Sequence, residues 1–201
     1  QGLSEPFITE VMAHGRVVGY LLRAGATLDQ LQALPLPFRV EVMEYGGGVV
    51  YLLRVGATLD QLQGLSESFR AEVMPHGRGV AILLSMNITL DQLQGLPEVF
   101  RTEVMAHGRG VTELLSMDIT LDQLQGLEEP FRTWVMANIG DVVSLLDVGA
   151  TLDQLQGLSE SFKAEFMADV EGVASLLRRG ITLDQLQGLS ESFRTWVMAH
   201  V

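Results

Sequence analysis

The side chains best suited to acid–base or metal chemistry are four histidines, since the chain has no cysteine. Their separations are all multiples of 31 residues, and they are His14, His76, His107 and His200. In a stacked array, neighbouring repeats lie about 10 Å apart, too far to share a zinc ion at about 2 Å per bond. No nucleophile or carboxylate recurs beside these histidines, so a general acid–base site is not formed either. The pattern predicts a protein that is not an enzyme and holds no metal and no cofactor.

The element that places these histidines is a tandem repeat. The string Thr-Leu-Asp-Gln-Leu-Gln begins six times at intervals of 31 residues, without insertion or deletion. A fixed period of this length is typical of solenoids, in which each unit buries its apolar face against its neighbours. We therefore expect an all-α protein, a right-handed α-solenoid superhelix, formed by one repeat array over residues 1–201. The array consists of a partial repeat 1–26, full repeats 27–57, 58–88, 89–119, 120–150 and 151–181, and a partial repeat 182–201.

Local signals within each repeat are helical. Thr58 with Gln61 three residues later has the form of a capping box, and another helix is expected to begin near Ser66. A loop is expected over residues 75–79, followed by a buried helix that ends at Asn87. Other copies have glycine at that last position, as a left-handed C-cap requires: Gly25, Gly56, Gly149 and Gly180. Whether each repeat has two or three helices stays open at this point.

Comparison of the copies separates the core from the surface. The apolar positions that recur in every full copy are expected to form the core, and in the first full copy they are Leu28, Leu31, Phe38, Met43, Leu52 and Leu53. One basic residue also recurs per copy: Arg39, Arg70, Arg101, Arg132, Lys163 and Arg194. This ladder is interpreted either as a stripe that follows phosphates or, preferably, as intrahelical pairs such as Glu67 with Arg70. Trp134 and Trp196, which replace a glutamate, are expected to pack at the surface.

Composition limits the classes of partner. The 201 residues include 13 Lys and Arg against 25 Asp and Glu, a formal net charge of −12. This balance excludes histones, basic arms and polybasic membrane binders. No apolar stretch approaches the roughly 18 residues of a membrane helix, so no membrane partner is expected. The expected loops of the first four copies are neutral or basic, which predicts that binding of a polyanion concentrates in the N-terminal half.

The centre of the expected loop varies between copies while its frame does not. Its two residues, copy by copy, are His14-Gly15, Tyr45-Gly46, His76-Gly77, His107-Gly108, Asn138-Ile139, Asp169-Val170 and His200-Val201. Loop residues that vary between copies, within flanking sequence that does not, suit a protein that recognises a linear ligand. Each repeat would then contact one unit of that ligand. No small-molecule substrate is indicated.

These residues resemble the repeats of transcription activator-like effectors, in a divergent 31-residue version. Leu96-Pro97-Glu98 is similar to the family's Leu-Thr-Pro-Glu, and Ala137-Asn138-Ile139-Gly140 is similar to its Ser-Asn-Ile-Gly. The resemblance implies a monomer that binds double-stranded DNA sequence-selectively, one base per repeat, and that acts as a bacterial effector in the bacterial cytoplasm or, after secretion, the host nucleus. It implies a preferred strand of four thymines, an adenine and one unassigned base.

The resemblance also implies roles for individual residues. Those that would face successive bases are Gly15, Gly46, Gly77, Gly108, Ile139 and Val170. Those that would brace the loop against its own helix are His14, Tyr45, His76, His107, Asn138 and Asp169. Those expected to contact phosphates are Arg16, Gly47, Arg78, Arg109 and Gly140.

Three other interpretations stay open. The leucine–glycine pattern from Leu145 to Phe162 is similar to that of mitochondrial transcription termination factors, which would also imply nucleic acid. An acidic, leucine-rich array is equally ordinary for a solenoid that binds a protein or peptide. Near-perfect repetition without cysteine also fits an engineered array.

Overall fold

The computed structural model describes residues 2–199, except for the side chains at 191, 195, 198 and 199. Every regular element in this part of the chain is a helix, which confirms the all-α prediction. Among the described residues, no helix is long and apolar enough to cross a membrane. The chain divides into two compact units, one up to Thr112 (unit 1) and one from Glu113 onward (unit 2). The division falls inside a helix rather than between two repeats, and a single array over the whole chain stays a prediction.

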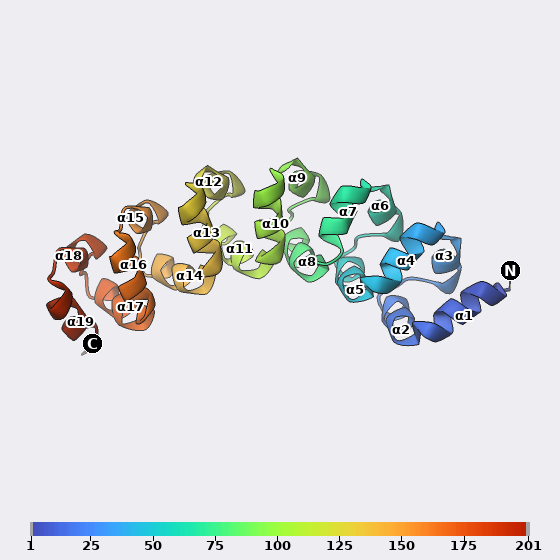
Figure 1. Cartoon of the computed structure of the whole chain (residues 1–201), viewed down its shortest axis with the longest axis horizontal. Coiled ribbons are helices and arrows are strands. Elements are labelled where there is room, and N and C mark those ends of the chain that lie inside the picture. Colours follow the sequence, from blue (N-terminus) through green and yellow to red (C-terminus); the bar gives the residue numbers. More distant parts are fainter. Residues whose placement is uncertain (1, 200–201) are drawn as a thin grey trace. The chain divides into compact units, whose positions relative to one another are not determined.

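Each repeat consists of three helices, which answers the question that the sequence left open (Figure 1). The short first helices carry the Leu-Asp-Gln-Leu-Gln string and are α3 (Leu28–Ala33), α6 (Leu59–Gly64), α9 (Leu90–Gly95), α12 (Leu121–Gly126), α15 (Leu152–Gln156) and α18 (Leu183–Gln187). The second helices are α1 (Glu5–Ala13), α4 (Leu36–Glu44), α7 (Glu67–Val73), α10 (Glu98–Ala106), α13 (Glu129–Ala137), α16 (Glu160–Met167) and α19 (Glu191–Ala199). The third helices are α2 (Gly15–Arg23), α5 (Gly46–Arg54), α8 (Gly77–Ser85), α11 (Gly108–Leu115), α14 (Ile139–Asp147) and α17 (Val170–Arg178).

Local hydrogen bonds set the ends of these helices as predicted. The Thr58 hydroxyl accepts the N–H of Gln61 at 3.1 Å, and the Gln61 side chain accepts the N–H of Thr58 at 2.9 Å. The same capping box begins all six first helices. Third helices are followed by a left-handed residue, which is glycine in four copies and Asn87 or Asp118, both with φ 63°, in the others. These caps therefore fix where the chain turns between helices.

The repeated apolar positions form the core. The second leucine of the string and the first leucine of the third helix's pair are almost fully buried in every full copy, as Leu31 and Leu52 show. Leu28 and Leu53 are only half-buried, although Leu59, the equivalent of Leu28 in the next copy, is buried. Third helices pack on one another within each unit, α2 on α5 and α5 on α8 in unit 1, and α14 on α17 in unit 2. Repeats thus bury their apolar faces against neighbours, as no single copy could do.

In four copies the basic ladder has a different role from both interpretations above, whereas Lys163 forms the expected intrahelical pair, with Glu160. Arg101 does not pair within its helix but with Glu72 of the preceding repeat, with Nε–Oε2 and Nη2–Oε1 distances of 2.8 and 2.7 Å. Its Nη1 donates to the carbonyls of Gln94 and Leu96 at the end of α9, and its guanidinium lies 5.3 Å from the ring centre of Phe69. One arginine thus caps a short helix, neutralises a half-buried carboxylate and covers an aromatic ring.

The same bridge recurs at other repeat steps. It joins Arg39 to Glu10, Arg70 to Glu41, Arg101 to Glu72 and Arg194 to Glu165. Arg194 lowers the pKa of Glu165 through its hydrogen bond to that carboxylate. Because these arginines are mostly buried and paired, they are not available to follow a phosphate backbone.

At one repeat step in unit 2, other residue types replace both partners of this bridge. Trp134 stands where other copies have the glutamate, and Lys163 stands where they have the arginine. The Lys163 ammonium lies 5.8 Å from the Trp134 ring and 5.0 Å from the Phe131 ring, and it pairs with Glu160 at 2.9 Å. An aromatic and intrahelical arrangement thus replaces the ion pair between repeats.

Replacing Arg101 with alanine is expected to lower the free energy of unfolding by about 2–4 kcal/mol, because Glu72 and two carbonyls lose their donor. Urea denaturation followed by far-ultraviolet circular dichroism measures the change. Arg23→Ala is the control, since Arg23 is exposed and forms no ion pair among the described residues, and it should shift the value by less than about 0.5 kcal/mol. Equal losses in the two variants would contradict the bridge as the main link between repeats.

Candidate functional site

The variable pair of each repeat lies where the second helix meets the third. Its first residue directly precedes the third helix, with φ from −93° to −119° and ψ from 15° to 29° in the first five copies. It is the only residue between the two helices at 14, 45, 107 and 138, whereas three residues, 74–76, separate α7 from α8. The second residue of the pair already begins the third helix, as Gly77 begins α8. The loop expected over residues 75–79 is therefore too long: α8 begins at Gly77, three residues before Val80, and the Val80 N–H already donates to the His76 carbonyl in the helical pattern.

The first residue of the pair behaves differently from copy to copy. The Asn138 amide donates to the carbonyl of Trp134 at 2.8 Å, which ties the junction back to α13. The Asp169 carboxylate instead accepts the N–H of Gly172 at 3.0 Å and caps α17. His14, Tyr45 and His76 make no side-chain cap hydrogen bond at the start of their third helices. His107 lies at the same junction, and His200 lies outside the described residues.

The second residue of the pair packs against the preceding repeat in unit 1. A Cβ added at Gly77 would meet the backbone of Gly48, and one at Gly108 would meet the backbone of Gly79. A Cβ at Gly46 would meet the side chain of Val17. All three glycines are buried, so close helix packing accounts for their lack of a side chain.

In the other copies, the second residue of the variable pair is more accessible to solvent. Gly15 is exposed with open space around its Cα, and Ile139 and Val170 are half-buried. Gly47 and Gly140, expected to contact phosphates, are also exposed, at the second position of their helices. Contact between the variable pair and DNA bases therefore stays a prediction. The accessible side chains near the pair lie along the third helices.

The third helices of unit 1 present an exposed row of arginine and tyrosine side chains at spacings of four and three residues. We call it the third-helix stripe, and it consists of Arg16, Tyr20, Arg23, Tyr51, Arg54 and Arg78. Spacings of i, i+4 and i+7 place side chains on one helix face, here opposite the buried residues Val18 and Leu21. The sequence singled out only Arg16 and Arg78 of this set; the i+4 and i+7 members lie outside the expected loop.

Arginine and tyrosine stack along the stripe, both within and between repeats. Arg16 Nε donates to the Tyr20 hydroxyl at 3.2 Å, and its guanidinium lies 5.6 Å from the ring centre. This hydrogen bond lowers the pKa of Tyr20. Arg78 of α8 lies 6.0 Å from the ring of Tyr51 on α5, so the stripe continues from one repeat to the next. Stacking holds the guanidinium planes in place while their outer N–H groups remain exposed.

In unit 1, the positions of basic and acidic residues differ by helix: the arginines outside the bridges lie on third helices, and the acidic residues lie on first and second helices. Its eight basic residues are all arginines, three of which form the bridges between repeats. The other five stand on third helices: Arg16, Arg23, Arg54, Arg78 and Arg109. The parts of these helices that belong to unit 1 contain no acidic residue. In unit 2 the third helices carry four acidic residues, Glu113, Asp141, Asp147 and Glu171, and one arginine, Arg178. A basic face therefore exists in unit 1 although the whole chain is acidic.

An open groove of about 420 Å³ lies beside this face, between the beginnings of α8 and α11. His76, Arg78 and Arg109 line it, together with Ile82 and Ala106. Two guanidinium groups and the amino ends of two helices give this groove a basic lining.

In comparisons with protein-family models, curated proteins and solved structures, nothing matches this chain.

Gly48→Ala is expected to lower the free energy of unfolding by about 1–3 kcal/mol, because the new methyl group would meet the Met74 carbonyl. Gly47→Ala in the same helix is the matched control. Nothing lies within 4 Å of its Cβ, and alanine there should stabilise the fold by up to about 1 kcal/mol. Thermal denaturation of both variants measures the difference, and a loss of stability in Gly47→Ala equal to that in Gly48→Ala would contradict the close contact.

Proposed function

We propose that the chain binds double-stranded DNA, with the third-helix stripe of unit 1 as its phosphate-binding surface. The observation that carries the proposal is the separation of charge in a chain with a net charge of −12: α2, α5 and α8 hold four exposed arginines and no acidic residue. Arg109 on α11 is also exposed, and that helix carries Glu113 after the end of unit 1. Guanidinium groups bind phosphate with two parallel hydrogen bonds, and neutralised phosphates release counterions.

The acidic total charge does not oppose this contact strongly. Charges farther away than about 8–10 Å are screened at physiological salt, so the stripe acts on a phosphate mainly through its own groups. The acidic residues of unit 1 stand on first and second helices, and three of them are neutralised by the arginine bridges. Tyr20 and Tyr51 hold Arg16 and Arg78 in place, which reduces the entropy lost on binding.

The proposal includes the arrangement of the repeats and the reading of sequence. The repeats that stack within each unit continue as one right-handed α-solenoid superhelix, which brings successive third helices along one DNA groove. Selectivity comes from the accessible members of the variable pair, above all Ile139, whose aliphatic side chain would lie against adenine. In unit 1, where packing buries three of the four glycines, the contact is mainly to the backbone.

The double variant Arg54→Gln/Arg78→Gln is expected to bind a labelled duplex more weakly and to reduce the slope of log K against log salt by about 1.8, since each phosphate contact contributes about 0.9. Fluorescence anisotropy between low and physiological salt measures both quantities. The control Arg178→Gln/Arg179→Gln removes two exposed arginines from unit 2 and should leave the slope almost unchanged. Equal effects of the two double variants, or no binding by the unaltered chain at low salt, would contradict the proposal.

A duplex that contains TTTTA is expected to bind more tightly than a scrambled duplex, by about 1–3 kcal/mol per mismatched base pair. Ile139→Gly should change the preference at the adenine alone, because it removes the only aliphatic contact there. Competition titrations with singly substituted duplexes measure this. If all duplexes compete equally while the stripe variants still lose affinity, the chain reads only the DNA backbone.

A further inference from the structure

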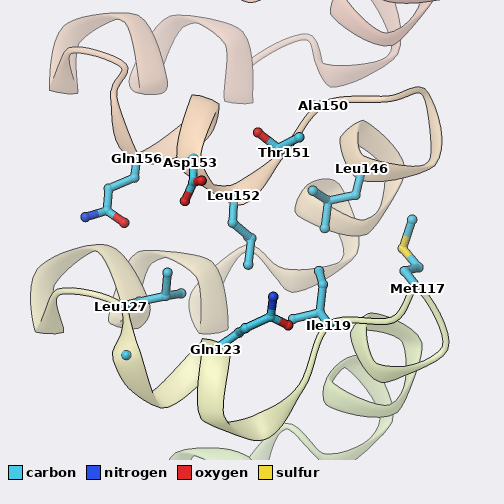
Figure 2. A pocket seen from close by; sticks show the side chains of 11 residues that line it. Met117, Ile119, Gln123, Leu127, Leu146, Ala150, Thr151, Leu152, Asp153 and Gln156 are labelled. Atoms are coloured by element: carbon cyan, nitrogen blue, oxygen red, sulfur yellow. The ribbon is translucent and has the colours of Figure 1, made fainter.

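The first helices form an open groove at a repeat step in each unit. In unit 2 the groove lies between α12 and α15 and has a volume of about 490 Å³ (Figure 2). In unit 1 it lies between α6 and α9 and has a volume of about 860 Å³. Equivalent positions of the repeat line the two grooves. We call them the first-helix grooves; they belong to the repeat itself, not to a local irregularity.

The floor of each groove is apolar. In unit 2, Leu152 points toward Ile119 across the groove, and Leu146 lies beside them (Figure 2). All three side chains are half-buried rather than covered by the protein. The apolar floor in unit 1 has Leu84 and Leu90 at the positions of Leu146 and Leu152. Ala57 stands at the position of Ile119, and Ile88 lines the groove where unit 2 has Ala150. An aliphatic chain lying on such a floor would remove apolar surface from water.

Apart from the glutamine of a capping box, the rim of each groove carries one carboxylate and one carboxamide, Asp153 with Gln156 in unit 2 and Asp91 with Gln94 in unit 1. Among the described residues, none of these four side chains forms a hydrogen bond or an ion pair. The capping box and the core account for the other members of the repeated string, but they leave its last glutamine unexplained.

Two other copies show what this glutamine can bind. The Gln32 side chain accepts the main-chain N–H of Ser4 at 3.0 Å, and the Gln187 side chain accepts the main-chain N–H of Ser159 at 3.3 Å. Each of these serines belongs to a neighbouring repeat. A carboxamide in this position therefore reaches the backbone of another chain segment, and it offers that segment both a donor and an acceptor.

The charge of the first helices specifies the occupant further. Each of the six carries an aspartate, and none carries a lysine or an arginine. The stripe on the third helices has the opposite charge, so the two surfaces select different ligands. An extended segment with basic side chains complements an apolar floor with a carboxylate at its rim.

We propose that each first-helix groove binds a short extended peptide segment in which a lysine or arginine is flanked by small residues. The aliphatic part of each basic side chain lies on the apolar floor, its charged end pairs with the rim aspartate, and the rim glutamine binds the peptide backbone. Neighbouring helices lie about 10 Å apart and an extended chain advances about 3.3–3.6 Å per residue. One groove therefore corresponds to about three peptide residues. This binding does not depend on the DNA proposal.

The test titrates the full chain into a labelled synthetic peptide with lysine at every third position among alanines and serines, and follows fluorescence anisotropy at physiological salt. A peptide of the same composition with its lysines grouped together is the control for simple charge attraction. The regularly spaced peptide should bind several-fold more tightly. Equal affinity for the two peptides, or no binding of either, overturns the proposal.

Matched protein variants locate the site. Asp91→Asn/Asp153→Asn removes the two rim carboxylates and should weaken binding about fivefold. Asp141→Asn/Asp147→Asn removes the same charge from the exposed surface of α14 and should weaken it less than about twofold. Both pairs are exposed, so neither variant should unfold the chain, which circular dichroism checks. If both double variants lose affinity equally, the peptide is attracted to the acidic chain as a whole, and the proposal that the grooves are the binding site is overturned.

Discussion

The arginine bridge between successive repeats is the interaction on which the rest of the structure depends. A first helix of five or six residues is too short to be stable by itself, and its last carbonyls have no partner within it. Arg101 supplies that partner, and it also joins its own repeat to Glu72 and covers Phe69 of the repeat before. The bridge therefore stabilises the local helix and the stacking of repeats at once, which explains why one basic residue per copy is kept at this position.

Close packing of the third helices is the second constraint, and it decides which residues can meet a ligand. Gly48 and Gly77 allow α5 and α8 to approach until their backbones are in contact. The variable pair is thereby drawn into the packing of unit 1, while exposed residues one, five and eight positions after the variable glycine form the stripe. In unit 2, Ile139 takes the glycine position, and its side chain remains half-exposed.

The two surfaces of the repeat differ in chemistry because they belong to different helices. First helices carry aspartate at the second helical position, where it favours the helix dipole, and so they present carboxylates. Third helices of unit 1 carry arginine and tyrosine on their exposed face. A net charge of −12 conceals this separation, because a sum over the chain contains no information on where each charge lies. Binding of a polyanion and of a basic peptide are compatible in one molecule when each ligand meets its own helix.

The sequence by itself determined everything that depends on interactions between residues close together in the chain. The capping box of Thr58 and Gln61, the second helix after Ser66, the left-handed end at Asn87 and the buried Leu31 all follow from spacings of a few residues, and all are confirmed. The tertiary structure decided what depends on stacking: Arg70 binds Glu41, 29 residues away, and not Glu67, which is only three away. It also decided that Gly77 packs against Gly48 and that Arg78 reaches Tyr51. A period of 31 residues states that repeats are equivalent, but only the register in which neighbours pack determines which side chains meet and which remain in water.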